Sequence, residues 1–174
     1  LRDLQEMANL ITDLLESERL SSRHAALHRE PVELARLAHE VIHDLQAKHA
    51  SADRIALHID DNLSAQSLDP TRLRLLLRNL LDNALRHSDA AAAPVELHIL
   101  QEGHSLHINV RDHGTGVAED QLPNMATPFF RPDAARGRST GGVGLGLYLC
   151  RLVAEAHDGT FQISNAQPGL RISV

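Results

Sequence analysis

The chain has 174 residues, of which 43% are apolar, 23% charged and 2% aromatic, and its formal net charge is −6. This length allows one domain with a short appendage, and the composition excludes both a disordered tail and a membrane-spanning run of about 20 apolar residues. The acidic charge argues against general nucleic-acid binding. The single cysteine, Cys150, excludes an internal disulfide framework and a cysteine-based zinc site. From its first residue, Leu1, and its end within an apolar alternation, we expect a fragment of a longer protein.

Residues 1 to about 28 are predicted to form one helix. Leu4, Met7, Ile11 and Leu14 recur at alternating steps of three and four, as along the seam between two packed helices. A lone helix of this kind cannot bury its seam, so it needs a partner. That partner is either a second helix in a dimer or the chain's own domain, and so short a seam does not decide between them.

The rest of the chain alternates helices with short strands. Asp69 and Pro70 mark a helix start, with Asp69 as N-cap, and Gly103 lies in a turn between two strands. Helices are predicted over 32–50, 70–87 and 143–157, and strands over 55–59, 95–99, 106–110, 160–164 and 170–174, with a turn-rich stretch over 113–142. This order predicts an α+β fold, a two-layer sandwich with helices on one face of a mixed sheet.

A polar stripe follows the helix predicted over 70–87. Asn79, Asn83 and His87 are spaced by four residues and share one face, with Arg86 alongside. Asparagine is a mediocre helix former, so two of them among leucines indicate that this face meets something polar. A carboxamide oxygen is a ligand suited to Mg²⁺. The alternative is that both amides cap or bridge groups within the core.

The sequence Asp112-His113-Gly114-Thr115-Gly116 comes directly after a predicted strand. Its two glycines would let a flat ligand approach the backbone closely, and the carboxylate can accept a hydrogen bond from an exocyclic amine. Taken alone, the pattern is more typical of a plain Asp/Gly turn.

A glycine-rich run, Gly141-Gly142-Val143-Gly144-Leu145-Gly146-Leu147, leads into an apolar helix. Free N–H groups at a helix start, together with the positive end of the helix dipole, can cradle an anion. The spacing and lysine of a Walker A loop are missing, and no strand precedes the run directly, as a Rossmann fingerprint requires. So many glycines cost stability, which favours a binding role.

The loop at residues 128–138 carries Arg131, Arg136 and Arg138 against one aspartate, Asp133. Long loops in compact domains are usually lids or binding loops. The adjacent pair of phenylalanines at its start favours docking on an apolar pocket over a disordered insertion.

These four elements, in this order and spacing, resemble the catalytic and ATP-binding domain of bacterial sensor histidine kinases. That domain belongs to the gyrase, Hsp90 and MutL ATPase superfamily, with its Bergerat-type α/β sandwich. Residues 79–87 resemble the N box, 112–116 the G1 box, 129–131 the F box and 142–147 the G2 box, and the match covers about residues 30–174. The helix at 1–28 resembles the second helix of a dimerisation and histidine-phosphotransfer hairpin, which implies two units, 1–28 and 29–174.

The resemblance implies a role for each matched residue. Asn83 would bind Mg²⁺ with Asn79 beside it, Arg86 would meet phosphate, and His87 would flank the nucleotide. Asp112 would accept the adenine amino group. The remaining ATP-binding positions would be Gly114 and Gly116 at the base, and Phe130, Gly142, Gly144, Leu145 and Gly146 toward the phosphates. Asn79, Arg131 and Arg136 would serve catalysis, the two arginines by contacting the γ-phosphate.

Two departures from the family pattern stand out. Leu170 occupies the place of a family threonine, so a water-mediated adenine contact is expected to be absent. The family's H box is missing, and His39-Glu40-Val41-Ile42 comes closest to it. The pair His39 and His43 has metal-ligand spacing, but solvated helical histidines are the more ordinary interpretation.

The resemblance implies a phosphotransferase that binds Mg·ATP and donates the γ-phosphoryl group to a histidine on a dimerisation domain. The fragment would not phosphorylate itself, and its partners would be that domain and a response regulator, in the cytoplasm beneath an inner-membrane sensor. The alternatives are a nucleotide-sensing or scaffold module without transfer, and a conformational clamp of the Hsp90 or MutL type.

Overall fold

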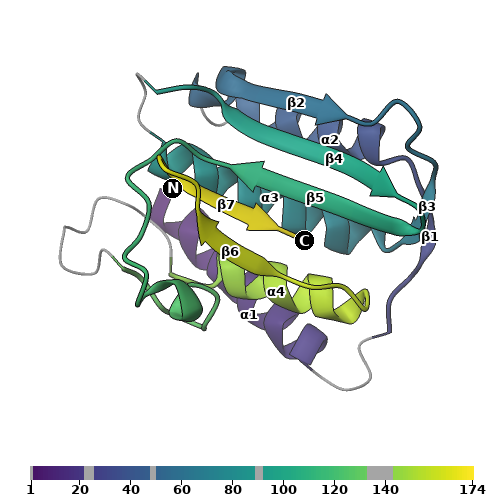
Figure 1. Ribbon diagram of the computed structural model, residues 1–174. Coiled ribbons are helices and arrows are strands. Elements are labelled where there is room, and N and C mark those ends of the chain that lie inside the picture. The colour runs from purple at the N-terminus through teal and green to yellow at the C-terminus, as the bar shows by residue number, and fades with distance from the viewer. Residues whose placement is uncertain (1, 22–25, 48–49, 89–91, 133–142) are drawn as a thin grey trace.

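The computed structural model describes residues 2–21, 26–47, 50–88, 92–132 and 143–174 (Figure 1). One layer is a β-sheet, and helices cover one of its faces. In chain order the elements are α1 (Arg2–Ser21), β1 (Glu30–Val32), α2 (Leu34–Gln46), a 3₁₀ turn (Ala50–Arg54), β2 (Ile55–Ile59), β3 (Gln66–Leu68), α3 (Pro70–His87), β4 (Val95–Glu102), β5 (Ser105–Arg111), a second 3₁₀ turn (Leu122–Asn124), α4 (Gly146–Ala156), β6 (Gln162–Asn165) and β7 (Leu170–Ser173).

The main sheet has five strands in the order β2-β4-β5-β7-β6. β2 and β4 run parallel, with α3 in the connection between them, and the other neighbours are antiparallel. Along β4, Val95, Leu97 and Ile99 are buried, while the alternate residues face away from the helices. The expected α+β sandwich, with helices on one face of a mixed sheet, is confirmed.

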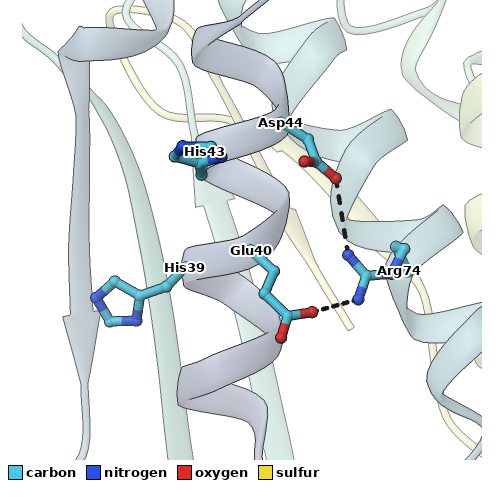
Figure 2. A pocket seen from close by; sticks show the side chains of 5 residues that line it. All are labelled: His39, Glu40, His43, Asp44 and Arg74. Carbon is cyan, nitrogen blue, oxygen red and sulfur yellow. Dashed lines mark hydrogen bonds and ion pairs between the residues drawn. The ribbon is translucent and has the colours of Figure 1, made fainter.

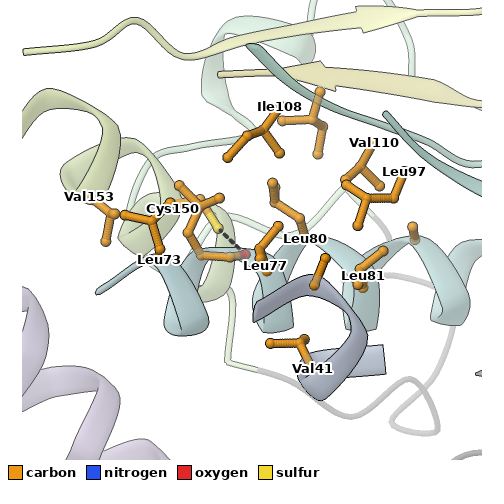
Figure 3. Packing of buried hydrophobic residues seen from close by; sticks show 14 of the residues in the cluster. Val41, Leu73, Leu77, Leu80, Leu81, Leu97, Ile108, Val110, Cys150 and Val153 are labelled. Carbon is orange, nitrogen blue, oxygen red and sulfur yellow. Dashed lines mark hydrogen bonds between the residues drawn. The ribbon is translucent and has the colours of Figure 1, made fainter. Parts of the chain in front are cut away.

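The core lies between this sheet face and the helices α2, α3 and α4 (Figure 3). α3 supplies more of its leucines than any other element, and Leu77, Leu80 and Leu81 are fully buried. The thiol of Cys150 on α4 lies 3.6 Å from the carbonyl oxygen of Leu76, which joins the two helices. With few aromatic residues in the chain, the core is aliphatic and depends on close leucine packing.

The start of α3 is fixed by Asp69, as the sequence predicts. One oxygen of its buried carboxylate accepts from the backbone N–H of Arg72 at 3.1 Å, and the other accepts from the N–H of His28 at 3.0 Å. Pro70 occupies the first turn, where no N–H is needed. This cap ties the segment before β1 to the central helix.

Several predicted boundaries are wrong. α1 ends at Ser21 and residues 26–28 are not helical, while the helix predicted over 32–50 spans only Leu34–Gln46. α4 begins at Gly146, because Gly144 has a φ of +79°, outside the helical region. The short pair β1 and β3 was not predicted, since strands of three residues show no periodicity.

α1 packs beside α4, at the opposite end of the helical layer from α2 (Figure 1). Leu20 is buried there, Glu16 pairs with Arg72 of α3, and Asp13 lies 3.9 Å from Arg78. The predicted seam faces elsewhere: its described residues Met7, Ile11 and Leu14 are 58%, 56% and 45% exposed. α1 therefore packs on the chain's own domain, and the described residues of the seam stay uncovered.

No helix in the described part of the chain is both long and apolar enough to cross a membrane.

The two acidic contacts of α1 should respond in opposite ways to neutralisation. Burial lowers the pKa of Arg72, so Glu16→Gln leaves a poorly solvated cation unpaired and should weaken α1 docking by about 1–3 kcal/mol.

Burial raises the pKa of Asp13 despite the attraction of Arg78, so the charged form of Asp13 opposes docking of α1, and lower pH should strengthen docking. Asp13→Asn should therefore strengthen docking at pH 7. Hydrogen exchange of the α1 amides measures the stability of docking in both variants, and a change of the same sign in Glu16→Gln and Asp13→Asn would contradict these assignments.

Leu80→Ala should lower the free energy of unfolding by about 3 kcal/mol, because a fully buried leucine leaves a cavity between α3 and the sheet. Leu100→Ala is the matched control, since this leucine lies on the outer face of β4 and is 37% exposed. Urea denaturation should show a large shift for the first and less than about 0.5 kcal/mol for the second. Similar losses in both variants would refute the assigned core face.

Candidate functional site

The polar stripe on α3 reaches the start of α4. Asn79 lies against Gly146, where a Cβ atom would stand 3.7 Å from the amide oxygen of Asn79. The amide nitrogen of Asn79 is buried and has no hydrogen-bond partner among the described residues. A buried donor without a partner is costly, so this nitrogen favours a bound ligand beside the first turn of α4. The expected contact of the asparagine stripe with something polar is thus consistent with the geometry.

Arg86, near the end of the same stripe, already has an acidic partner. Arg86 forms an ion pair with Asp82 one turn earlier, at 2.8 Å, and its side chain is 39% exposed. His87 is the last residue of α3, and its exposed side chain lies at the end of the helix. Arg86 can therefore turn toward an anion only by sharing or leaving its partner Asp82.

The carboxylate of Asp112 is the most tightly held part of the site. Asp112 is only 3% exposed, and its Oδ1 accepts from the N–H groups of both Gly114 and Leu170, at 2.9 and 3.1 Å. Among the described residues, these two bonds leave the second oxygen, Oδ2, able to accept from a ligand. The Asp112 N–H in turn donates to the Leu170 carbonyl at 3.0 Å. The carboxylate is thus fixed in one orientation before any ligand binds.

Glycines permit the close contacts around Asp112. A Cβ atom at Gly114 would lie 2.2 Å from the carbonyl oxygen of His87, and one at Gly169 would lie 2.0 Å from the carbonyl oxygen of Asp112. No side chain fits in either position without moving backbone. Gly114 therefore brings the turn after β5 against the end of α3, and Gly169 brings the β6–β7 turn against Asp112.

Asn165, at the end of β6, was missed in the sequence analysis. Its side-chain amide pairs with the backbone of Val117 in both directions, at 3.0 and 2.8 Å, and also donates to Glu119 at 2.8 Å. Gly116 packs on this amide with a φ of +71°. The amide thus acts like an extra strand residue that holds the far side of the turn, and no spacing in the sequence pointed to it.

The glycine-rich run meets the loop at residues 128–138 at its base. The N–H of Phe129 donates to the carbonyl of Gly144 at 3.0 Å, and a Cβ atom at Gly144 would lie 2.8 Å from the carbonyl oxygen of Phe130. Phe129 has a φ of +65° and is 59% exposed, an unusual conformation that often accompanies function. Leu145 is buried at the N-cap of α4, and Arg131 is partly buried. Arg136 and Gly142, two predicted site residues, lie outside the described residues, as does Arg138.

Among the described residues, close approaches of three glycines thus link the four sequence clusters. Gly146 touches Asn79, Gly114 touches His87, and Gly144 touches Phe130. The site therefore has two polar parts. One is the buried Asp112 carboxylate near the β6–β7 turn, and the other is the unpartnered amide nitrogen of Asn79 on α3, beside the start of α4. A flat base with an exocyclic amine fits the first, and an anionic group fits the second.

Other candidates do not form such a site. A shallow depression between α2 and α3 is lined by His39, Glu40, His43, Asp44 and Arg74, all outside the four clusters (Figure 2). There Arg74 bonds to Glu40, which lowers the pKa of that carboxyl, and lies 3.8 Å from Asp44. The charges are satisfied locally, and no group of three metal ligands occurs in the described part of the chain.

Cys150 is also unsuited to chemistry. It is fully buried among leucines, and this burial strongly raises the pKa of its thiol. The reactive thiolate is therefore not formed at neutral pH, and the residue is part of the core.

The chain is similar in sequence to proteins of a known ATPase family. The family described as "Histidine kinase-, DNA gyrase B-, and HSP90-like ATPase" matches residues 68–174. The circadian input-output histidine kinase CikA of Synechococcus elongatus is 31% identical over 164 residues, which cover 92% of this chain and 22% of that protein. The sensor protein RstB of Escherichia coli is 32% identical over 169 residues, 97% of this chain and 38% of that protein. The chain therefore spans well under half of these relatives.

Solved structures agree at the level of the fold. The crystal structure of full-length ShkA in complex with AMPPNP superposes with a TM-score of 0.82 at 24% identity, covering 99% of this chain and 36% of that one. The nucleotide-free catalytic domain of histidine kinase ThkA gives a TM-score of 0.70 at 21% identity, covering 84% of this chain and 93% of that one. With the family match extending over more than half of its length, the chain belongs to the histidine kinase-, DNA gyrase B- and HSP90-like ATPase family.

Proposed function

We propose that the chain binds Mg·ATP and donates the γ-phosphoryl group to a histidine on a dimerisation domain, as part of two-component signal transduction. The observation that carries this proposal is the Asp112 carboxylate, buried and oriented by two backbone N–H groups. Family membership and the sensor-kinase relatives support the same function.

The adenine end of the proposed site is built around Asp112. The exocyclic amine of the base would donate to Oδ2. Gly114 and Gly116 would shape the turn beside the base, because their missing Cβ atoms let the turn pack on the carbonyl of His87 and the side chain of Asn165. His87 would flank the base from the end of α3. Leu170 contributes its backbone N–H to Asp112, and its side chain is buried, so the absence of a threonine hydroxyl leaves this bond intact.

The phosphate end is proposed to lie at the start of α4. Asn79 would donate its orphaned amide N–H to a phosphate oxygen, and the first N–H groups of α4 would face the same charge. Gly142, Gly144, Leu145 and Gly146 would line this part of the site, next to Phe130. These residues fit a triphosphate because they offer donors and no carboxylate.

Cations would complete the phosphate end. Asn83 is the proposed ligand of Mg²⁺, which when bound would offset phosphate charge and help align the terminal group. Arg86 would supply a positive charge from α3. Arg131 and Arg136 would approach the γ-phosphate from the arginine-rich loop. Phosphoryl transfer depends mainly on positioning and electrostatic stabilisation, which are the contributions these side chains can make.

The acceptor is proposed to lie outside the ATP-binding unit. In the transfer, the bond from the γ-phosphorus to ADP would break and a bond to an imidazole nitrogen would form. α1, with residues 1–28, would belong to the dimerisation unit, and residues 29–174 to the ATP-binding unit. The exposed seam of α1, at Met7, Ile11 and Leu14, supports a helical partner. A response regulator would then receive the phosphoryl group, in the cytoplasm beneath a membrane sensor.

Asp112→Asn should weaken ADP binding at least tenfold while leaving the fold intact. The asparagine oxygen can still accept from Gly114 and Leu170, but its NH₂ group would then face the adenine amine, donor against donor. Calorimetric titration with Mg·ADP tests this, with circular dichroism as the check on folding. Unchanged affinity in a folded variant would show that Asp112 does not recognise the nucleotide, and no ADP binding to the intact chain would refute the proposed function.

The chain should phosphorylate a separately supplied acceptor helix pair that carries a histidine, and should not label itself. Radiolabelled ATP with acid-labile product detection tests the transfer, and Asn79→Ala should reduce it by at least tenfold. Heat-denatured chain is the negative control. ATP binding with no phosphohistidine on acceptor pairs from sensor-kinase relatives would favour the nucleotide-sensing scaffold.

A further inference from the structure

The outer face of the sheet carries a carboxylate shared by two imidazoles. Oε1 of Glu96 on β4 lies 3.1 Å from Nε2 of His113, and its Oε2 lies 3.2 Å from Nε2 of His98. An ionised carboxylate only accepts hydrogen bonds, so both contacts require a proton on Nε2. His98 is further held by His58 of β2, whose ring stacks on it with centroids 4.4 Å apart. The side chains thus form a connected row from β2 to the turn after β5.

His113 is the residue of this row whose backbone belongs to the turn of the proposed adenine site. It stands between Asp112 and Gly114 in the chain, and its side chain is only 8% exposed. Its backbone N–H lies 3.4 Å from the hydroxyl of Ser88, at the end of α3. The contacts of the His113 ring therefore help to fix the backbone of the turn that carries Asp112 and Gly114.

We infer that Glu96 is a positioning residue for adenine recognition, acting through its hydrogen bond to the His113 imidazole. This inference rests on the proposed function and adds a residue outside all four sequence clusters. The turn after β5 is held at Asp112 by Leu170 and at its far side by Asn165. Glu96 holds it from a third direction, across the outer face of the sheet.

The geometry favours a positioning role over a surface ion pair. Glu96 is opposite Arg111 in the β4–β5 register, yet the Arg111 guanidinium donates to the carbonyl of Ala166 at 3.3 Å. The two oxygens of Glu96 are instead directed to the two histidines. Because His113 is largely buried, its ring has few alternative partners, and losing Glu96 would leave an N–H group in poorly solvated surroundings.

The test compares nucleotides with and without the adenine amine. ADP and inosine diphosphate are titrated calorimetrically into the intact chain, Glu96→Ala and Glu96→Gln. Glu102→Ala is the matched control, because Glu102 is on the same strand but 79% exposed and lies 3.8 Å from His107. Glu96→Ala should weaken ADP binding about five- to tenfold and reduce the preference for ADP over inosine diphosphate. Glu96→Gln should retain most of that preference, since its amide oxygen can still accept from His113, and the control should match the intact chain.

Each outcome bears on the inference. Unchanged ADP affinity in Glu96→Ala would overturn it, and so would an equal loss for both nucleotides, which would indicate a general structural effect. If Glu96→Ala does not fold, the His113 ring of the intact chain gives the answer by ¹⁵N NMR: an Nε2–H tautomer is expected, and an Nδ1–H tautomer overturns the inference. Failure of the intact chain to bind ADP would refute the proposed function and this inference together. Loss of binding in Asp112→Asn with none in Glu96→Ala would refute the inference alone.

Discussion

The pair of backbone hydrogen bonds to Oδ1 of Asp112 is the contact on which the arrangement of the site depends. Through it, the end of β5, the following turn and the start of β7 meet at one buried carboxylate. A buried carboxylate needs hydrogen-bond donors, so the two N–H groups both stabilise the Asp112 side chain and fix its direction, and leave Oδ2 to accept from a ligand. Gly114 and Gly169 make this possible because no side chain stands between the segments.

α3 relates that carboxylate to the rest of the site. Its apolar face is anchored in the core by Leu77, Leu80 and Leu81, so its polar face is held in a constant position. The end of the helix at His87 supports the turn after β5, and Asn79, about two turns earlier, supports the start of α4. The two ends of the proposed nucleotide site are therefore spaced by a rigid helix rather than by loops.

α1 has two distinct faces. One packs on the domain, with Leu20 buried and Glu16 paired to Arg72. The other carries the exposed apolar residues of the predicted seam, including Met7 and Ile11. Because the face that packs on the domain and the exposed apolar face are different, the helix can contact the domain and a second helix at the same time. Of the two partners that the sequence left open, the structure shows the chain's own domain, and a second helix in a dimer stays a prediction.

Local sequence determined the elements and the clusters that carry the chemistry. The cap at Asp69, the alternation along β4 and the spacing of Asn79, Asn83 and His87 depend on neighbouring residues, so their patterns could be interpreted without coordinates. Tertiary structure alone decided the contacts made by Glu96, Asn165 and Leu170. These residues reach the site from separate strands, and hydrogen bonds between segments distant in the chain leave no periodic signal in a single sequence.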